Sequence, residues 1–212
     1  MLEKARYIVV EGPIGAGKTT LAKRLADRLN AEVQLENPAA NAFLGRFYQN
    51  MERWGLPTQI AFLFQRSEQL ARFAQEHDPH KRVVSDFLID KDPLFAELTL
   101  AEDELQLYRQ LYERLKPTVR KPDLVIYLQA QADTLIERVR KRGVESERKI
   151  NEIYIQRVAE RYATFFHHYD AAPLFIVNAE SLNPVDKDED FELLYSRLLA
   201  MRSYREFFGY SA

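Results

Sequence analysis

The chain has 212 residues, 46% of them hydrophobic and 29% charged, with a formal net charge of −2. This composition is ordinary for a globular protein, and no global charge favours nucleic acid or an anionic membrane surface. The absence of cysteine excludes disulfides, thiolate zinc sites and cysteine nucleophiles. We expect one domain over residues 1–212 and a cytoplasmic location, because no signal peptide or bilayer-spanning run is recognisable.

The first element is a short apolar strand at residues 7–10, followed by a glycine-rich turn and an amphipathic helix. The turn fits G-x-x-x-x-G-K-[ST], the phosphate-binding loop, in the strand-then-helix context that the motif requires. Backbone N–H groups and the helix N-terminus would bind phosphate oxygens, with Lys18 on the β- and γ-phosphates and the Thr19 hydroxyl on Mg²⁺. The residues expected to bind the nucleotide are Gly12, Pro13, Ile14, Gly15, Ala16, Gly17, Lys18, Thr19 and Thr20.

Further apolar runs alternate with helical stretches along the chain, which indicates a parallel sheet covered on both faces. We therefore predict an α/β fold, a P-loop kinase-like three-layer α/β/α sandwich with a mobile lid. The aromatic tail, Tyr204, Phe207, Phe208 and Tyr210, is expected to pack back onto the domain or a partner subunit. The five predicted strands lie at residues 7–10, 32–35, 82–84, 124–128 and 174–177.

Two carboxylates follow the second and third predicted strands. Ligands collect at the carboxyl ends of strands in open α/β sheets, so Glu36 should face the same crevice as the phosphate loop. There it could accept a proton from an attacking hydroxyl or orient that hydroxyl, although a helix-capping glutamate is the alternative. Asp86 takes the position of a carboxylate that holds hydrated Mg²⁺, with a structural cap as the alternative. Lys91 and Asp92 follow closely and could project into the crevice.

A long helix is expected from residue 58 to 75, after Pro57, and its apolar residues lie nearly all round it. Such a helix is buried on more than one side. Gln59 and Arg66 share one face, two turns apart, where an amide and a guanidinium could bind a base edge. Taken alone, such residues are more often at the surface of a helix.

The stretch from Arg138 to Arg148 carries five basic residues in eleven, with a glycine between them. This composition suits a lid, at about residues 138–150, that closes on phosphates. For Arg140 and Lys141 we favour a simple role as basic charge at a helix C-terminus. We assign Arg138, Arg142 and Arg148 to the lid.

Five stretches together identify a family. Across nearly its whole length the chain resembles the deoxyribonucleoside kinases, above all the bacterial deoxyadenosine/deoxyguanosine kinases. The order and spacing of these stretches are far more specific than the phosphate loop alone. They lie at residues 11–19, 47–59, 64–66, 85–87 and 138–147.

The resemblance implies roles for individual residues. Glu36 matches the carboxylate beside the attacking 5′-hydroxyl, a general base. Tyr48 and the lid residue Glu147 match the pair that holds the sugar 3′-hydroxyl, and Gln59 matches a bidentate base reader with Arg66 near it. Arg138 and Arg142 match lid arginines, one near the donor adenine and one on the phosphates, and Lys18, Asp86 and Arg142 complete the catalytic set with Glu36.

The chain also departs from the family pattern. Many relatives carry an acidic-Arg-Ser triplet after the third strand, whereas this chain has Asp86 followed by Phe87 and Leu88. The missing positive charge would come from Lys91 or from the lid. The base-selecting aspartate is Asp90 or Asp92.

The predicted function is phosphoryl transfer from ATP·Mg²⁺ to the 5′-hydroxyl of a deoxynucleoside, with purines favoured. Two alternatives remain at this point. One is a nucleoside monophosphate kinase of the thymidylate kinase type, which would need extra arginines for the acceptor phosphate. The other is a non-catalytic nucleotide-binding regulatory subunit. A homodimer, or a heterodimer with a related subunit, is expected in each case.

Overall fold

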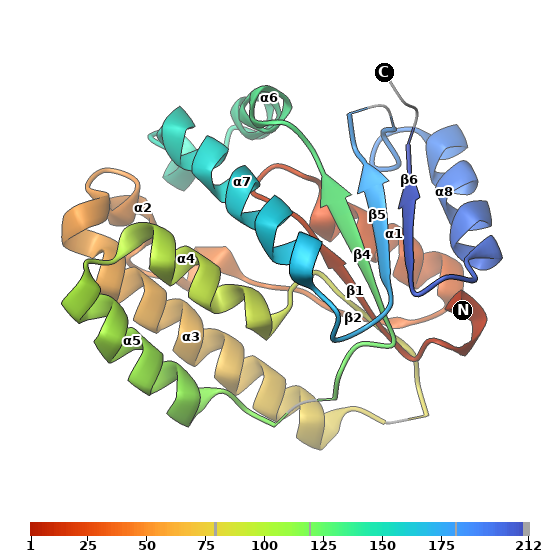
Figure 1. Cartoon of the computed structure of the whole chain (residues 1–212), viewed down its shortest axis with the longest axis horizontal. Coiled ribbons are helices and arrows are strands. Elements are labelled where there is room, and N and C mark those ends of the chain that lie inside the picture. Colours follow the sequence, from red (N-terminus) through yellow and green to blue (C-terminus); the bar gives the residue numbers. More distant parts are fainter. Residues whose placement is uncertain (79, 119, 181, 210–212) are drawn as a thin grey trace.

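The computed structural model describes residues 1–78, 80–118, 120–180 and 182–209, and its centre is a parallel sheet. The strand order is β2-β3-β1-β4-β5-β6, and every pairing between neighbours is parallel (Figure 1). The first strand lies inside the sheet between β3 and β4, as the motif context predicts. The strands are β1 (Tyr7–Glu11), β2 (Glu32–Gln34), β3 (Val83–Ser85), β4 (Leu124–Gln129), β5 (Leu174–Asn178) and β6 (Arg205–Phe208).

The prediction of five strands is wrong, because the sheet has a sixth strand at its edge. β6 pairs with β5, and its residues alternate between exposed and half-buried positions, so it lacks the continuous apolar run of the inner strands. The aromatic tail does pack back onto the domain: the Phe208 ring lies 6.1 Å from that of Phe175, and the Tyr204 hydroxyl donates to a backbone carbonyl. Tyr210 lies outside the described residues.

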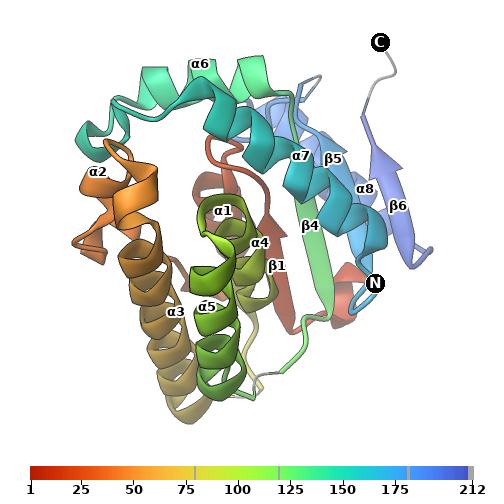
Figure 2. The ribbon, with the colours of Figure 1, turned by 60° about the vertical axis from the view of Figure 1, so that its left-hand side comes forward.

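Helices cover both faces of the sheet, which gives the three predicted layers (Figure 2). The helices α1 and α8 pack on one face, whereas α3, α4 and α7 pack on the other, with α5 against α3 and α4. None of the helices in the described ranges is long and apolar enough to cross a membrane. The α-helices are α1 (Lys18–Leu29), α2 (Leu44–Phe47), α3 (Met51–Glu76), α4 (Asp92–Thr99), α5 (Glu102–Leu115), α6 (Ala132–Arg142), α7 (Glu152–His168) and α8 (Asp188–Ala200).

Four 3₁₀ turns complete the described elements: η1 (Leu2–Lys4), η2 (Pro38–Ala40), η3 (Ile89–Lys91) and η4 (Glu145–Glu147).

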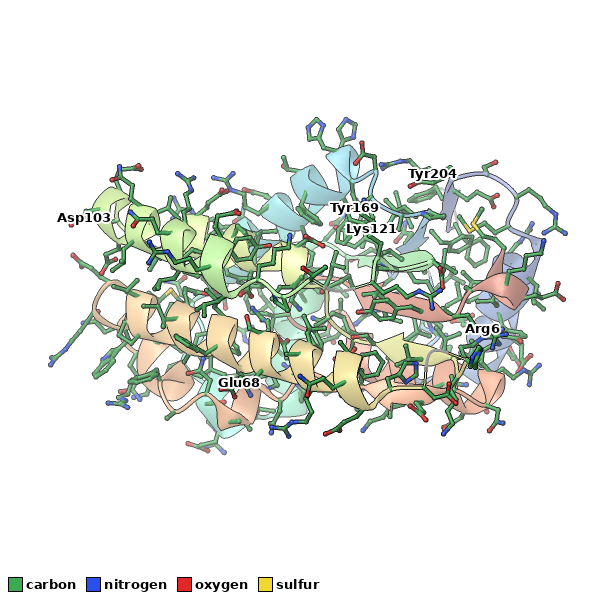
Figure 3. The ribbon with its side chains drawn as sticks, turned by 90° about the horizontal axis from the view of Figure 1, so that it is seen from below. Arg6, Glu68, Asp103, Lys121, Tyr169 and Tyr204 are labelled. Carbon is green, nitrogen blue, oxygen red and sulfur yellow. The ribbon has the colours of Figure 1, made fainter. Side chains whose placement is uncertain are left out.

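The long helix α3 begins earlier than the sequence predicts. Asn50 caps it, its side chain accepting a hydrogen bond from the backbone N–H of Arg53, so Pro57 lies within the helix. Seen from below, α3 and α5 lie side by side and carry the exposed Glu68 and Asp103 (Figure 3). Between these two helices lies an apolar cluster, so α3 is buried on more than one side, as its sequence predicts.

Candidate active site

The phosphate-binding loop connects the inner strand β1 to the start of α1. Gly15 and Gly17 have φ angles of 88° and 94°, a region that favours glycine. A Cβ on Gly15 would lie 2.8 Å from a backbone oxygen of α6, and one on Gly17 would lie 2.5 Å from a Val185 methyl. Both glycines are therefore required by conformation and by space. The loop brings the free N–H groups at the start of α1 to the carboxyl edge of the sheet.

Lys18 is buried at the start of α1, where its Nζ donates to the carbonyl of Pro13 at 3.1 Å. Burial and then the nearby charge of Lys91 together lower the pKa of Lys18 to about 8, against the opposing effect of the surrounding carboxylates. The ammonium is thus held in a place where its charge is poorly compensated. A phosphate group would supply the missing negative charge.

Thr19 and Asp86 bring two oxygen ligands together beside the loop. The Thr19 hydroxyl donates to Asp86 Oδ2 at 2.5 Å, and Asp86 Oδ1 accepts from the backbone N–H of Glu36 at 2.7 Å. A hydroxyl and one carboxylate, completed by phosphate oxygens and water, are the kind of ligands that Mg²⁺ takes in phosphoryl-transfer enzymes. In the described part of the chain no group of three or more His, Cys, Asp or Glu could hold a metal by itself. The residues present therefore fit a nucleotide-bound Mg²⁺.

Glu36 follows β2 and meets two cations. Arg66 Nε donates to Glu36 Oε1 at 2.5 Å, and Lys91 Nζ lies 3.6 Å from Oε2. Burial raises the pKa of Glu36, but Arg66, Lys91 and Lys18 together outweigh burial and lower it to about 2. The carboxylate is therefore ionised at neutral pH. It can accept a hydrogen bond from a hydroxyl and orient it, although it is a weak base.

One cavity joins the phosphate loop to α3, α4, α7 and the lid. It brings together side chains that the sequence analysis selected from segments far apart in the chain. The predicted site residues that line it are Ile14, Gly15, Lys18, Thr19, Glu36, Tyr48, Gln59, Arg66, Asp86, Lys91, Arg142 and Glu147.

The two candidate base-selecting aspartates lie in different surroundings at the turn η3. Asp92 is buried and forms an ion pair with Arg66, behind the wall of the cavity. Asp90 instead pairs with Lys116 at 2.7 Å, and both of these side chains are partly exposed. Neither aspartate lines the cavity, but Asp92 contacts Arg66, which does, so the assignment of Asp92 as the base-selecting residue stays a prediction.

The hydrogen-bonding roles of two polar side chains in the cavity, Gln59 and Tyr48, are fixed by their surroundings. The Thr99 hydroxyl donates to the carbonyl of Phe95 at 2.8 Å, so it can only accept from Gln59 Nε2, which lies 3.3 Å away. This contact orients the Gln59 amide and leaves its oxygen free for the cavity. Burial raises the pKa of Tyr48 well above its ordinary value, so its hydroxyl stays protonated.

The lid meets the cavity through an ion pair. Arg142, at the end of α6, donates to both carboxylate oxygens of Glu147, at 2.7 and 2.6 Å. Glu147 belongs to η4, which contacts α2 across the cavity mouth. The lid thus places an ion pair, Arg142 with Glu147, at the cavity.

The remaining basic residues of the lid separate into three groups. Arg138 donates to the carbonyl of Ala179 and lines a second cavity, together with Lys141, Arg142 and residues 15–20 of the phosphate loop. Arg140 pairs with Glu152 outside both cavities. Arg148, which the sequence analysis assigned to the lid, pairs with Glu145 and lines neither of these two cavities.

Sequence reasoning gave no role to Glu11 or to Thr99. Glu11 is fully buried at the end of β1, where its carboxylate lies 3.1 Å from Lys91 Nζ. The available signal was a carboxylate at the end of an otherwise apolar strand, directly before the phosphate loop. Nothing in the sequence marked Thr99, because its contact with Gln59 depends on how α4 packs on α3.

A phosphate-binding loop beside a lidded cavity, with an ionised carboxylate at their junction, defines a phosphotransferase of the P-loop kinase class. The family model for deoxynucleoside kinase matches residues 8–200. The chain belongs to the deoxynucleoside kinase family, whose members transfer a phosphoryl group to a deoxynucleoside.

Relatives in sequence and in structure agree with this assignment. The chain is 33% identical to a deoxyguanosine kinase of Bacillus subtilis (strain 168), an alignment that covers 90% of this chain and 95% of that one. It is 30% identical to a deoxyadenosine kinase of Lactobacillus acidophilus, covering 84% and 87%. A solved deoxyadenosine kinase from M. mycoides with bound dATP superposes with a TM-score of 0.79 at 26% identity, covering 91% and 99%.

Proposed function

We propose that this enzyme transfers the γ-phosphate of ATP, with Mg²⁺, to the 5′-hydroxyl of a purine deoxynucleoside. The observation that carries the proposal is the position of Glu36. Its ionised carboxylate lies in the acceptor cavity, and its backbone N–H is bonded to Asp86, which in turn accepts from Thr19 of the phosphate loop. A hydroxyl bound by Glu36 would therefore point at the terminal phosphate of a nucleotide held by that loop.

The donor would lie along the phosphate loop and the second cavity. Its phosphates would bind the N–H groups of residues 15–20, with Lys18 and Arg142 on the β- and γ-phosphates. Arg138, which lines the outer part of that cavity, would lie nearest the adenine. Mg²⁺, held by Thr19 and Asp86, would neutralise charge on the phosphates.

The acceptor would fill the lidded cavity. Glu36 orients the 5′-hydroxyl and takes its proton as the phosphoryl group is transferred. Tyr48, at the end of α2, and Glu147, in η4 of the lid, bind the 3′-hydroxyl together, since both line the cavity and α2 contacts η4. Gln59 binds the edge of the base.

Purine preference is supported by the donors and acceptors near Gln59. Its amide oxygen can accept from an exocyclic amino group, and its second N–H can donate to a ring nitrogen. Arg66, fixed by Asp92, adds donors for an acceptor at position 6 of guanine. Relatives named deoxyguanosine kinase and deoxyadenosine kinase are both found. We propose that both purine deoxynucleosides are substrates, with deoxycytidine a weaker one.

The two alternatives from the sequence are less well supported. A nucleoside monophosphate kinase needs extra arginines for the acceptor phosphate, whereas this cavity has the ionised carboxylate of Glu36 at the acceptor position, which would repel a phosphate. A purely regulatory subunit would have no use for an ionised carboxylate beside the phosphate loop. Both arguments favour a catalytic nucleoside kinase.

The test is steady-state turnover with ATP·Mg²⁺ and a panel of acceptors: the four deoxynucleosides and their 5′-monophosphates. We expect the highest kcat/KM for deoxyadenosine and deoxyguanosine. Turnover only of a monophosphate would establish the thymidylate kinase type, and no turnover with intact ATP binding would establish the regulatory subunit. Lys18→Ala serves as the matched inactive control, with kcat expected to fall more than about tenfold, or 1.4 kcal/mol.

The same proposal includes a dimer of this chain, or a heterodimer with a related subunit. Two large apolar side chains support it, Phe64 on α3 and Leu107 on α5, each 45% exposed on neighbouring helices. Three statements stay predictions: that the chain is a single catalytic domain, that its lid lies at about residues 138–150, and that the enzyme is located in the cytoplasm.

A further inference from the structure

A fully buried carboxylate ends β1 directly before the phosphate loop. Glu11 accepts hydrogen bonds from the backbone N–H groups of Gly12 at 3.0 Å and Leu88 at 2.7 Å. The Tyr162 hydroxyl, from α7, donates to the same carboxylate at 3.3 Å. One side chain therefore joins the start of the phosphate loop to the segment that leads into η3.

The last residue of η3 supplies the counter-ion. Lys91 Nζ lies 3.1 Å from Glu11 Oε1 and 3.6 Å from Glu36 Oε2, and its side chain is only 2% exposed. Lys91 lines the acceptor cavity, whereas Glu11 does not. Its charge also reaches Lys18, since Lys91 is, after burial, the main cause of the lowered pKa of Lys18. The ammonium thus lies between the carboxylate that holds it and the place where the phosphoryl group would be transferred.

The segment after β3 has no other cation that could serve here. Phe87 occupies the position directly after Asp86, and its fully buried ring packs with Leu63 and Tyr108 between α3 and α5. An ammonium group has three N–H donors. The ion-pair partners of Lys91 in the described residues are the two carboxylates named above. One donor therefore remains for an oxygen atom in the cavity.

We propose that Lys91 is a catalytic residue that donates to an oxygen of the transferring phosphoryl group, and that Glu11 is the positioning residue that holds it there. The inference rests on the proposed function. In the step, the bond from the 5′-oxygen to the γ-phosphorus forms while the bond to the bridging oxygen of the diphosphate breaks. Glu36 takes the hydroxyl proton, and Lys91 keeps its protons and stabilises the charge on the equatorial oxygens.

The first experiment removes the charge of Lys91. Lys91→Met should lower kcat by about 10²–10³-fold, the effect of removing one preorganised donor. The Kd for ATP, measured by calorimetry without acceptor, should stay within about threefold. Lys91→Arg, which keeps the charge, should recover at least about tenfold of the lost kcat. The matched control is Lys116→Met, which removes an ammonium paired with Asp90 outside the site and should leave kcat within about twofold.

The second experiment tests the role of Glu11 with Glu11→Gln, made in the wild-type and in the Lys91→Met background. If Glu11 acts through Lys91, Glu11→Gln should lower kcat by at least about tenfold in the wild type and by less than about twofold in Lys91→Met. Equal factors in both backgrounds would show that Glu11 supports the fold alone. The double variant, Glu11→Gln with Lys91→Met, removes both charges of this ion pair. Its kcat can therefore be measured on a protein that does not carry one of these two ions buried without its partner.

The outcomes separate this inference from the proposed function. A wild-type enzyme that phosphorylates no deoxynucleoside would contradict the proposed function itself. An active wild type with Lys91→Met within about threefold of its kcat, or with Lys91→Arg no better than Lys91→Met, would overturn only the role of Lys91.

Discussion

Replacing Arg66 by methionine should unfold the protein at a markedly lower temperature, because its guanidinium joins two buried carboxylates. It bonds Glu36 at 2.5 Å and pairs with Asp92, and these carboxylate side chains are 13% and 2% exposed. Removing one partner of a buried ion pair costs about 3–5 kcal/mol, since the other charge is left uncompensated. Lys91 still faces Glu36, so we expect the lower end, about 3 kcal/mol. For a domain of this size that corresponds to a Tm lowered by about 6–12 °C.

The sign of the pH dependence follows from the pKa of Glu36. Its folded pKa, about 2, lies below the ordinary value of 4.5, so its contribution to stability is present above pH 4.5 and is lost as the pH falls toward 2. Methionine at position 66 removes the largest of the charges that lower this pKa. The difference in unfolding free energy between the wild type and Arg66→Met should therefore be full at pH 7 and shrink as the pH falls below 5.

The assay is urea unfolding at pH 7, 5 and 4, followed by circular dichroism, without ligands. Arg72→Ala is the matched control, because Arg72 is an exposed arginine of the same helix, and its effect should stay within about 0.5 kcal/mol. Adding Asp92→Leu to Arg66→Met should recover part of the loss by removing one unpaired charge. A loss below about 1 kcal/mol at pH 7, or one that does not change with pH, would refute this account of Arg66.

Three further measurements test the site. Between about pH 8 and 9.5 the Kd for ATP should increase with pH, by up to about tenfold per pH unit, because Lys18 of the ligand-free enzyme loses its proton near pH 8. Calorimetry on Lys18→Ala should show no such increase. Tyr48→Phe and Glu147→Gln should each lower kcat/KM about tenfold more for deoxynucleosides than for 3′-deoxy analogues, and equal losses would contradict their assignment to that hydroxyl. Thr99→Val should change the ratio of kcat/KM for deoxyadenosine and deoxyguanosine by at least about threefold, because it frees the Gln59 amide to turn. The control Thr99→Ser keeps the hydroxyl and should leave that ratio unchanged. An unchanged ratio in both variants would show that Thr99 does not orient the amide.

The inner part of the fold could be predicted because its signals are local. The phosphate loop is specified by glycines whose backbone angles and close contacts exclude other residues, as at Gly15 and Gly17. The strand before it is an uninterrupted apolar run. The carboxyl ends of parallel strands face the same crevice, so the positions of Glu36 after β2 and of Asp86 after β3 could be predicted from the topology alone.

Other features depend on contacts that no local pattern encodes. The pairing of Glu11 with Lys91 requires β1 to lie beside β3, and the pairing of Arg66 with Asp92 and not with Asp90 depends on the direction of one turn at η3. The true start of α3 was missed because Pro57 is usually taken as a helix start, whereas here the cap at Asn50 starts the helix and the proline is tolerated inside it.

The sixth strand has a consequence for how the chain can be cut. β6 pairs with Leu174–Val177 of β5, the four apolar residues of that strand. A protein truncated before Arg205 would present that apolar strand with its row of backbone N–H and C=O groups unpaired, a template for joining another chain. The residues from Arg205 to Phe208 therefore cover the apolar edge of β5, and we expect a chain shortened before Arg205 to aggregate through that edge.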